Sequence, residues 1–269
     1  MKRALHHALA VAAALLIALP LALMLMNSFK SPGEAQQGFL ALPREPGLAA
    51  WRQAWAQLSG SFAVSLMLAV PAVGLSALLA ALNGFVLCKY RFKGERWVGL
   101  LLVLAFFLPI KVYLLPLAIT MAKLGLERSL GLLIAIHVIY SVPLALFFRN
   151  HFLAFPDELL QAARLDGAGF WRLLWRVVLP LSRPIFVVVL ILQFTTIWNE
   201  YLFGLVFGPE GARPITAALA QLSAQTETGA RAYPLEMAAA LLAAAPTLAV
   251  YLLAGRHFTR GLVAGAVKG

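Results

Sequence analysis

The chain has 269 residues, of which 62% are hydrophobic and only 12% are charged, and its mean hydropathy is +0.85. Soluble domains are close to half apolar and about a quarter charged, so this composition excludes an ordinary soluble protein and indicates a membrane protein. A single cysteine, Cys88, excludes an internal disulfide framework and a cysteine-based zinc site. The net charge of +11 does not indicate nucleic-acid binding, because the basic residues stand at the ends of apolar runs, where membrane topology accounts for them.

Six apolar runs are long enough to cross a bilayer, which takes about 20 helical residues for roughly 30 Å of hydrocarbon. In chain order, the expected spans are about 8–26, 61–82, 97–119, 130–148, 184–206 and 236–255. The first run has no small-residue cleavage site before Asn27, so we expect a retained anchor and not a removed signal peptide. The sequence therefore predicts an all-α, polytopic membrane protein with six transmembrane helices in one domain, residues 1–269.

The distribution of basic residues predicts the orientation of these spans. If the N-terminus is cytoplasmic, the inner segments hold fourteen of the 22 Lys and Arg residues. The short loop 83–96 is the clearest case, with four basic residues and one acid. Both termini, including a tail at 256–269, are therefore expected on the cytoplasmic side. On the outer side, Trp51 and Trp55 fit either a short helix at the headgroup level or packing against the next span.

A charged segment at 156–183 interrupts the apolar pattern. Six charged residues in its part 157–180 exclude a seventh span, because they would cost about 15 kcal/mol or more in the bilayer against about 5 regained from the apolar side chains. Asp157 and Glu158 follow Pro156, as at a helix N-terminus. Asp166 and Gly167 predict a turn. The sequence therefore predicts a helix–turn–helix outside the membrane.

The second helix of this segment is expected from Phe170 up to a break at Pro180. Apolar residues recur along it at helical spacing, and they are Phe170, Leu173, Leu174 and Val177. Arg172 and Arg176 lie on another face. Two interpretations stay open on these grounds. The segment lies on the membrane surface with its arginines near anionic lipid, or it docks a cytoplasmic partner through the small residues Ala162 and Ala163.

Three short stretches of the segment resemble the EAA signature found in membrane subunits of bacterial ABC importers. They are Gln161-Ala162-Ala163, Asp166-Gly167-Ala168 and Val178-Leu179-Pro180. The stretch from Pro156 to Leu159 resembles the carbohydrate-uptake branch. Asn27-Ser28-Phe29-Lys30 and the ending 260–269 are similar to the smaller permease subunit of maltose-type importers. The resemblance covers essentially the whole chain, with one departure: the signature begins with Glu where this chain has Gln161.

This resemblance implies a permease that forms half of a sugar translocation path in the bacterial inner membrane and follows ATPase closure by alternating access. The implied partners are a second homologous permease, a cytoplasmic ATPase dimer that binds ATP-Mg, and an extracytoplasmic solute-binding protein. The implied ATPase-coupling residues are Glu158, Gln161, Ala162, Ala163, Asp166, Gly167, Ala168, Leu179 and Pro180, with Gly265 and Lys268 as a second contact in the tail. Gln161 puts a salt bridge at that position in doubt, but not the docking.

The chain itself is expected to be neither an enzyme nor a cofactor-binding protein, because it contains no G-x-x-x-x-G-K-[ST] loop. Polar residues at membrane depth are candidates for the substrate path: Lys111, Asn199 and Glu200, with Trp198 as a ring that stacks on a sugar. Lys111 and Glu200 either form an ion pair there, or Lys111 snorkels outward and Glu200 caps its helix. The alternatives are an ion-coupled secondary transporter, an intramembrane enzyme, or an importer of a polyol or glycerol phosphate.

Overall fold

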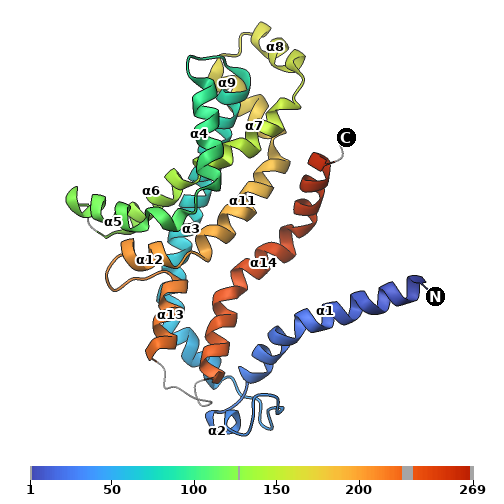
Figure 1. Ribbon diagram of the computed structural model, residues 1–269, viewed down its shortest axis with the longest axis vertical. Coiled ribbons are helices and arrows are strands. Elements are labelled where there is room, and N and C mark those ends of the chain that lie inside the picture. Colours follow the sequence, from blue (N-terminus) through green and yellow to red (C-terminus); the bar gives the residue numbers. More distant parts are fainter. Residues whose placement is uncertain (1, 127, 226–232, 267–269) are drawn as a thin grey trace. The chain divides into compact units, whose positions relative to one another are not determined.

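The computed structural model describes residues 2–126, 128–225 and 233–266, and every regular element in these ranges is a helix (Figure 1). The all-α fold expected from the sequence is confirmed. By its internal contacts the chain divides into two compact units, Met1–Ala63 with Ile215–Pro246 and Val64–Pro214 with Thr247–Gly269. Two long helices, α3 (Ala49–Lys89) and α14 (Tyr233–Ala266), contribute to both units, so neither unit is one continuous stretch of sequence.

The first unit contains α1 (Lys2–Asn27), the short α2 (Pro32–Ala35) and α13 (Ile215–Gln225), together with the first parts of α3 and α14. The apolar stretch of α1 has none of its residues buried inside the chain. Leu16 and Ile17, for example, are 72% and 75% exposed. A helix that is apolar on every side needs lipid or another chain around it, so α1 is the element of this unit that most clearly requires a membrane.

The second unit holds the remaining helices. Up to the charged segment they are α4 (Glu95–Phe107), η1 (Ile110–Tyr113), α5 (Leu114–Lys123), α6 (Leu130–Tyr140), η2 (Val142–Leu144) and α7 (Ala145–Leu153). The charged segment forms α8 (Asp157–Leu165), α9 (Phe170–Leu173), the π-helical η3 (Leu174–Val178) and α10 (Leu179–Leu181). After it come α11 (Arg183–Trp198) and α12 (Leu202–Phe207).

Among the described residues, four helices are long and apolar enough to cross a membrane: Leu5–Asn27, Ala49–Lys89, Leu130–Leu153 and Tyr233–Gly255. Two bent pairs raise the number to six if each is one span. In the first pair, Glu95–Phe107 and Lys111–Lys123 meet at 90°. In the second, Phe170–Leu181 and Arg183–Trp198 meet at 79°. The run expected at 97–119 is therefore not a continuous helix. The second bend lies at Ser182, before the run expected at 184–206, and that run is interrupted further on, between Trp198 and Leu202.

Proline accounts for the first of these breaks. Leu108 precedes Pro109 and has an extended backbone with φ −76° and ψ 123°, because the proline ring disfavours helical geometry in the residue before it. The chain resumes as the 3₁₀ turn η1. In the later run, α11 ends at Trp198 and α12 starts only at Leu202.

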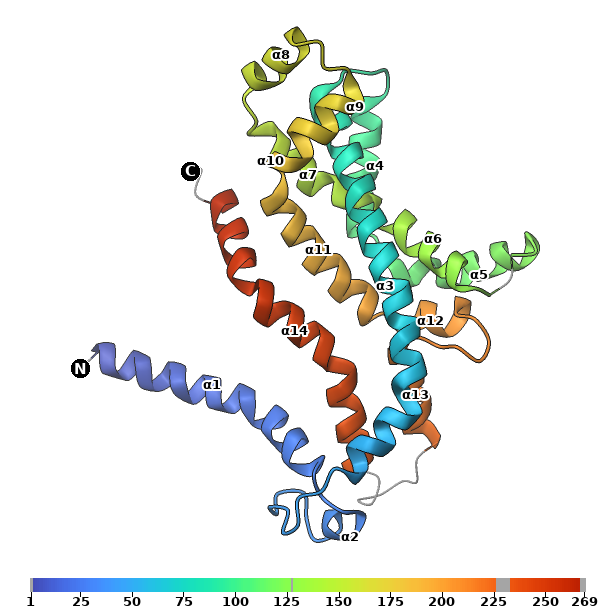
Figure 2. The same ribbon diagram turned by 180° about the vertical axis from the view of Figure 1, so that it is seen from behind.

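The aromatic core of the second unit lies under the charged segment, where α7 and α9 lie beside the end of α3 (Figures 1 and 2). Phe85, Phe148 and Phe152 are fully buried there. The rings of Phe85 and Phe152 meet edge to face at 5.7 Å, and those of Phe148 and Phe186 at 4.7 Å. Such pairs add about 0.5–1.5 kcal/mol each beyond the burial of their area. This core fixes α8 and α9 to the membrane helices.

A glycine lets α3 and α7 approach closely within this core. A Cβ atom added at Gly84 would stand 2.6 Å from Cβ of Phe148, 2.7 Å from the carbonyl oxygen of Ala145 and 2.8 Å from the backbone nitrogen of Arg149. Two of these three atoms belong to the backbone and cannot turn aside. The helices therefore pack at this distance only because position 84 has no side chain.

We expect Gly84→Ala to lower the thermal stability of the protein, because the added methyl forces the two helices apart at a cost of about 1–3 kcal/mol. Gly74→Ala in the same helix is the matched control, since a Cβ at Gly74 would have no atom within 4 Å. Thermal unfolding in the same detergent or nanodisc measures both. An equal melting temperature for the Gly84 variant and the wild type would contradict the close approach.

Candidate functional site: the helix–turn–helix at residues 156–183

The first helix of the segment, α8, begins and ends as its sequence predicts. Asp157 and Glu158 stand in its first turn, where their negative charge favours the helix dipole. At its end the N–H of Ala168 donates to the carbonyl of Ala163, and the N–H of Gly167 donates to that of Arg164, both at 3.0 Å. This is the Schellman motif, in which the residue after the C-cap, here Gly167, has a left-handed backbone conformation. Gly167 has φ +78°, so a glycine is required there.

The two faces of α8 differ in burial. Leu160 is 4% exposed and Ala163 packs against the same core. The residues exposed on the other face are Glu158, Leu159, Gln161, Ala162, Leu165 and Asp166, of which Leu165 is 88% exposed. Ala162 and Ala163, which the sequence places together on one docking face, therefore lie on different faces of α8. Ala162 faces outward, whereas Ala163 holds the helix to the core.

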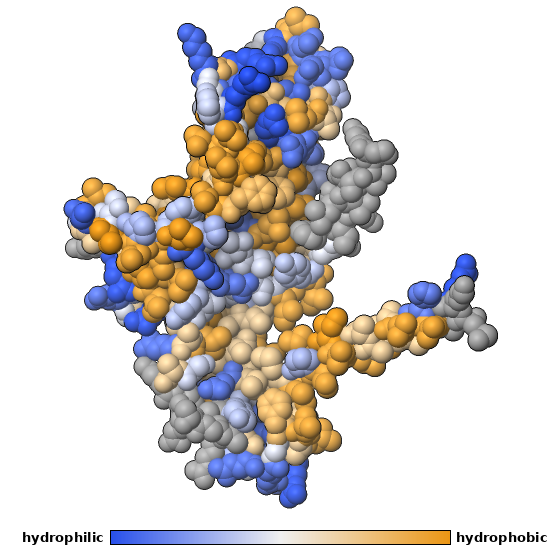
Figure 3. Space-filling view, in the orientation of Figure 1, coloured by the Kyte–Doolittle hydropathy of each residue, from blue (hydrophilic) through white to orange (hydrophobic). Residues whose placement is uncertain are grey.

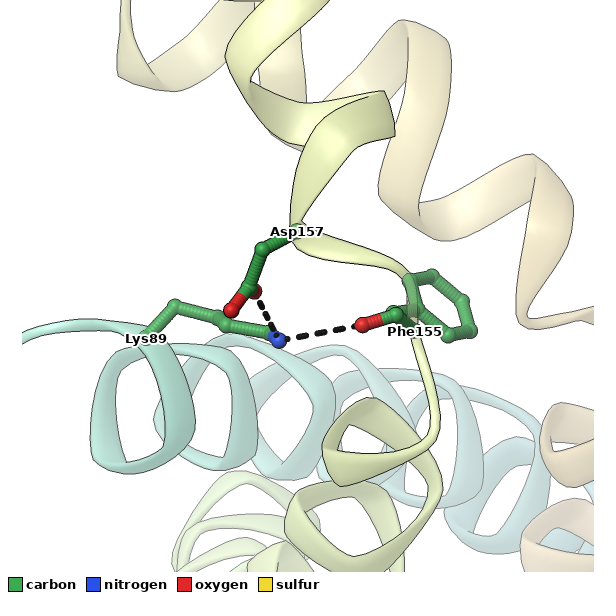
Figure 4. A network of polar contacts seen from close by, with 3 residues as sticks. All are labelled: Lys89, Phe155 and Asp157. Atoms are coloured by element: carbon green, nitrogen blue, oxygen red, sulfur yellow. Dashed lines mark hydrogen bonds and ion pairs between the residues drawn. The ribbon is translucent and has the colours of Figure 1, made fainter.

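Polar contacts fasten both ends of α8 to the end of α3. The ammonium group of Lys89 lies 2.7 Å from Oδ1 of Asp157 and donates to the carbonyl of Phe155 at 3.3 Å (Figure 4). At the other end, the guanidinium of Arg164 lies over the ring of Tyr90, 5.6 Å from its centroid, and donates to its hydroxyl at 3.4 Å. Sequence reasoning missed Lys89, Tyr90 and Phe155, because about 70 residues separate Lys89 and Tyr90 from their partners.

The second half of the segment keeps the predicted faces. Leu173 and Leu174 are buried, while Trp171, Trp175 and the arginines at 172 and 176 are exposed. Instead of one regular helix, however, the chain widens to a π-helix at Leu174–Val178, just before Pro180. Pro180 has no N–H for a regular helical bond and its ring would meet the carbonyl four residues earlier, which a wider turn avoids.

The four candidates for the substrate path lie around the break after α11. Trp198 is 1% exposed and stacks on Phe194 at 5.4 Å, so neither ring face is open to a ligand in this conformation. Asn199 donates to the carbonyl of Thr195 at 2.9 Å and closes α11. Their role in substrate passage stays a prediction.

Glu200 caps the start of the following helix α12. Its carboxylate accepts the N–H groups of Leu202 at 2.9 Å, Phe203 at 2.7 Å and Gly204 at 3.3 Å. Lys111 is exposed in η1 and near enough for its charge to act favourably on Glu200. Of the alternatives set out from the sequence, the structure shows the cap, and the ion pair with Lys111 stays a prediction. The capped end is the N-terminus of α12 and not the C-terminus of α11.

Comparison with known proteins identifies the family. Residues 46–263 match the family described as binding-protein-dependent transport system inner membrane component. A probable ABC transporter permease protein of Pyrococcus horikoshii is 40% identical over 190 residues, which cover 69% of this chain and 68% of that protein. The chain belongs to this family of ABC transporter permeases. An ion-coupled secondary transporter and an intramembrane enzyme are thereby set aside.

Other relatives of the permease have names that include their solutes. A xylose/arabinose import permease protein of Haloferax volcanii is 33% identical over 228 residues, covering 77% of this chain and 73% of that protein. A melibiose/raffinose/stachyose import permease protein of Bacillus subtilis is 28% identical over 260 residues, covering 93% and 91%. The permease also has the fold of a chain in a bacterial alginate ABC importer, with TM-score 0.82, 21% identity and 96% of both chains covered.

The loop that follows α1 in the permease is built around two buried polar residues whose role the sequence did not reveal. Lys30 is 3% exposed, and its ammonium donates to Oδ1 of Asn27 at 2.8 Å and to the carbonyls of Gly38 and Phe39 at 3.0 and 3.2 Å. The amide of Asn27 donates to the carbonyls of Leu23 and Phe39. The stretch Asn27-Ser28-Phe29-Lys30 thus closes the loop onto the end of α1.

Glu34 closes the same loop from its other side. Its carboxylate accepts the backbone N–H groups of Ser31 at 2.9 Å, Arg44 at 2.7 Å and Glu45 at 3.2 Å. These bonds, that of Ser31 foremost, stabilise the charged form and lower the pKa of Glu34 from 4.5 to about 2. Because the pKa in the folded loop lies below the unfolded value, this stabilisation is complete above about pH 4.5 and is lost as the pH falls through about 2.

For Glu34→Gln we expect faster hydrogen exchange at the amides of residues 31, 44 and 45 at neutral pH, because a neutral amide holds these N–H groups less strongly than a carboxylate. In the wild type their protection should stay constant down to about pH 4.5 and then fall toward pH 2. Glu45→Gln is the control, since Glu45 joins the arrangement through its backbone. Unchanged protection in the Glu34 variant would show that the carboxylate does not close the loop.

Lys89→Met should loosen the start of α8 without unfolding the permease. Asp157 is 69% exposed, so the pair contributes at most about 1 kcal/mol to stability and acts mainly on position. Hydrogen exchange over 157–165 should become faster in this variant, and the exchanged pair Lys89→Asp with Asp157→Lys should restore part of the protection. Glu158→Gln, one residue along, is the control. Protection that is equal in all four proteins would mean that the contact does not hold α8.

Proposed function

We propose that this permease is one of two membrane subunits of an ATP-driven importer for a sugar or a closely related solute. The sugar import permeases among its relatives support the solute class. A second homologous permease would complete the translocation path, and an extracytoplasmic solute-binding protein would deliver the solute. ATP-Mg would bind to a cytoplasmic ATPase dimer, because this chain has no phosphate-binding loop of its own.

The observation that carries the proposal is the outward face of α8. Leu159, Ala162 and Leu165 are exposed on a helix whose ends are both fastened to α3. In the space-filling view, hydrophilic side chains gather around this end of the second unit, beyond a hydrophobic band (Figure 3). Apolar side chains held rigidly among charged ones fit a protein partner better than solvent. We therefore assign this face to the ATPase.

The contacts of α8 suggest how ATPase closure reaches the membrane helices. Because Lys89 and Tyr90 hold α8 at both ends, a displacement of α8 carries the end of α3 with it. The buried Leu160 and Leu173 couple the same segment to α7 and α11 through the aromatic core. A segment attached in this way moves as a rigid body with its helices, as alternating access requires.

The same contacts support the proposed orientation. Lys89 and Asp157 touch, so the loop after α3 and the helix–turn–helix lie on one side of the membrane. Both carry the basic residues expected on the cytoplasmic side. The N- and C-termini would then be cytoplasmic too. Of the proposed tail contact, Gly265 lies within α14 and Lys268 lies outside the described residues.

Ala162→Asp should abolish ATP-driven uptake and reduce copurification of the ATPase about tenfold or more, because it places an unpaired charge in the proposed interface. Ala162 is chosen over Ala163, since Ala163 packs inward and its replacement would also disturb folding. Gly167→Pro should act similarly by breaking the turn. The matched control is Ala56→Asp, an exposed position in the first unit. Full copurification of the ATPase with the Ala162 variant would contradict the docking surface.

Gln161→Glu tests the departure from the family signature in the same assay. If Gln161 meets the ATPase through hydrogen bonds alone, the restored carboxylate should leave copurification unchanged. Stronger retention of the ATPase at low salt would instead indicate a basic partner opposite this position.

A further inference from the structure

A groove of about 390 Å³ lies between α3, α4 and α7 in the second unit, and neither the docking face nor the substrate path uses it. Its walls are mostly apolar, with Leu87 from α3, Gly99 and Val103 from α4, and Leu146 from α7. Arg96, in the first turn of α4, and Arg149 of α7 also line it. Gly99 and Val103 lie one and two turns further along α4, so the groove combines a cationic end with an apolar wall.

The two arginines have no partner within the described part of the chain: neither has an ion pair or a side-chain hydrogen bond there. The one acid of the groove, Glu95, is paired with Arg91 at 3.1 Å. Arg96 is exposed and Arg149 is half-buried, so both remain accessible, and an anion in the groove would meet positive charge that no acid of the described chain neutralises. The groove therefore has the composition of a site for an anionic amphiphile.

The residues next to the groove are of the types found at the interface between membrane and water. Phe92 and Trp97 flank Arg96 and are 39% and 72% exposed. Aromatic rings at this place in a chain lie at the headgroup level, with basic residues beside them. Lys93 adds another exposed positive charge. The start of α4 is thus expected where lipid headgroups meet the hydrocarbon.

We propose that this groove binds an anionic phospholipid of the cytoplasmic leaflet. Arg96 and Arg149 hold the phosphate, and an acyl chain lies along Gly99, Val103 and Leu146. Basic pockets between transmembrane helices on this side of a membrane bind such headgroups. Only the assignment of the leaflet rests on the proposed function, through the orientation that docking of the ATPase gives. A second permease subunit is a less fitting occupant, because it would have to bury two unpaired arginines.

The test uses the complete transporter complex, purified in detergent and analysed by native mass spectrometry with added phosphatidylglycerol. Arg96→Gln with Arg149→Gln should bind this lipid about 30-fold more weakly, since each basic residue near an anionic headgroup contributes about fivefold. Arg44→Gln with Arg52→Gln removes the same charge from exposed positions in the first unit and should bind it as the wild type does. Equal loss in both double variants would overturn the proposal, as would absence of the lipid from the wild-type complex.

Two further variants of the experiment distinguish a seated lipid from a free anion and from attraction by charge alone. Val103→Trp fills the apolar wall without a change of charge and should weaken phosphatidylglycerol binding, and unchanged binding would overturn the placement of the acyl chain. An excess of glycerol phosphate should not displace the lipid, and displacement would identify a site for free anions. The ATPase should stay bound in the arginine variants. Its absence already in the wild type would contradict the proposed function, while the lipid can still be measured on the permease subunits that remain.

Discussion

Aromatic side chains packed beneath α8 and α9 hold the charged segment to the rest of the permease. Phe85 lies in the last turns of α3, Phe148 and Phe152 lie in α7, and Phe186 lies in α11, so one cluster joins three membrane helices. Leu160 and Leu173 enter it from the segment itself. If this cluster were loose, α8 would be a flexible loop on the surface, and motion of a bound partner would not reach the helices.

The polar contacts of α8 fix its position on this aromatic core and contribute little to the stability of the fold. The pair between Lys89 and Asp157 is largely open to solvent at the aspartate, which limits its energy but not its effect on where α8 begins. In the loop after α1, buried Lys30 and Asn27 pair fully with carbonyl groups, which avoids the cost of unpaired polar groups in a closed loop. In each unit, a lysine with its acceptors thus fixes the position of a loop: Lys30 in the first unit and Lys89 in the second.

At breaks in the apolar helices, backbone N–H groups become free to bind polar side chains. The chain bends at Pro109, before the exposed Lys111, and α11 ends at Trp198, after which Glu200 caps α12. An uninterrupted helix has no free N–H groups in its middle and would leave a carboxylate there without partners. The break therefore gives Glu200 three donors, and the groove between α3, α4 and α7 shows the opposite case, in which two arginines lack acceptors within the described chain.

Several features followed from the sequence alone, because they depend on near neighbours. The helical class, the turn at Gly167 and the apolar face of Leu173 and Leu174 are all local. Only the tertiary structure placed Lys89 against Asp157, divided Ala162 from Ala163, buried Trp198 and set Arg96 beside Arg149. Those relations join residues from different helices, and their distances depend on how the helices pack, which hydropathy and spacing along one chain do not contain.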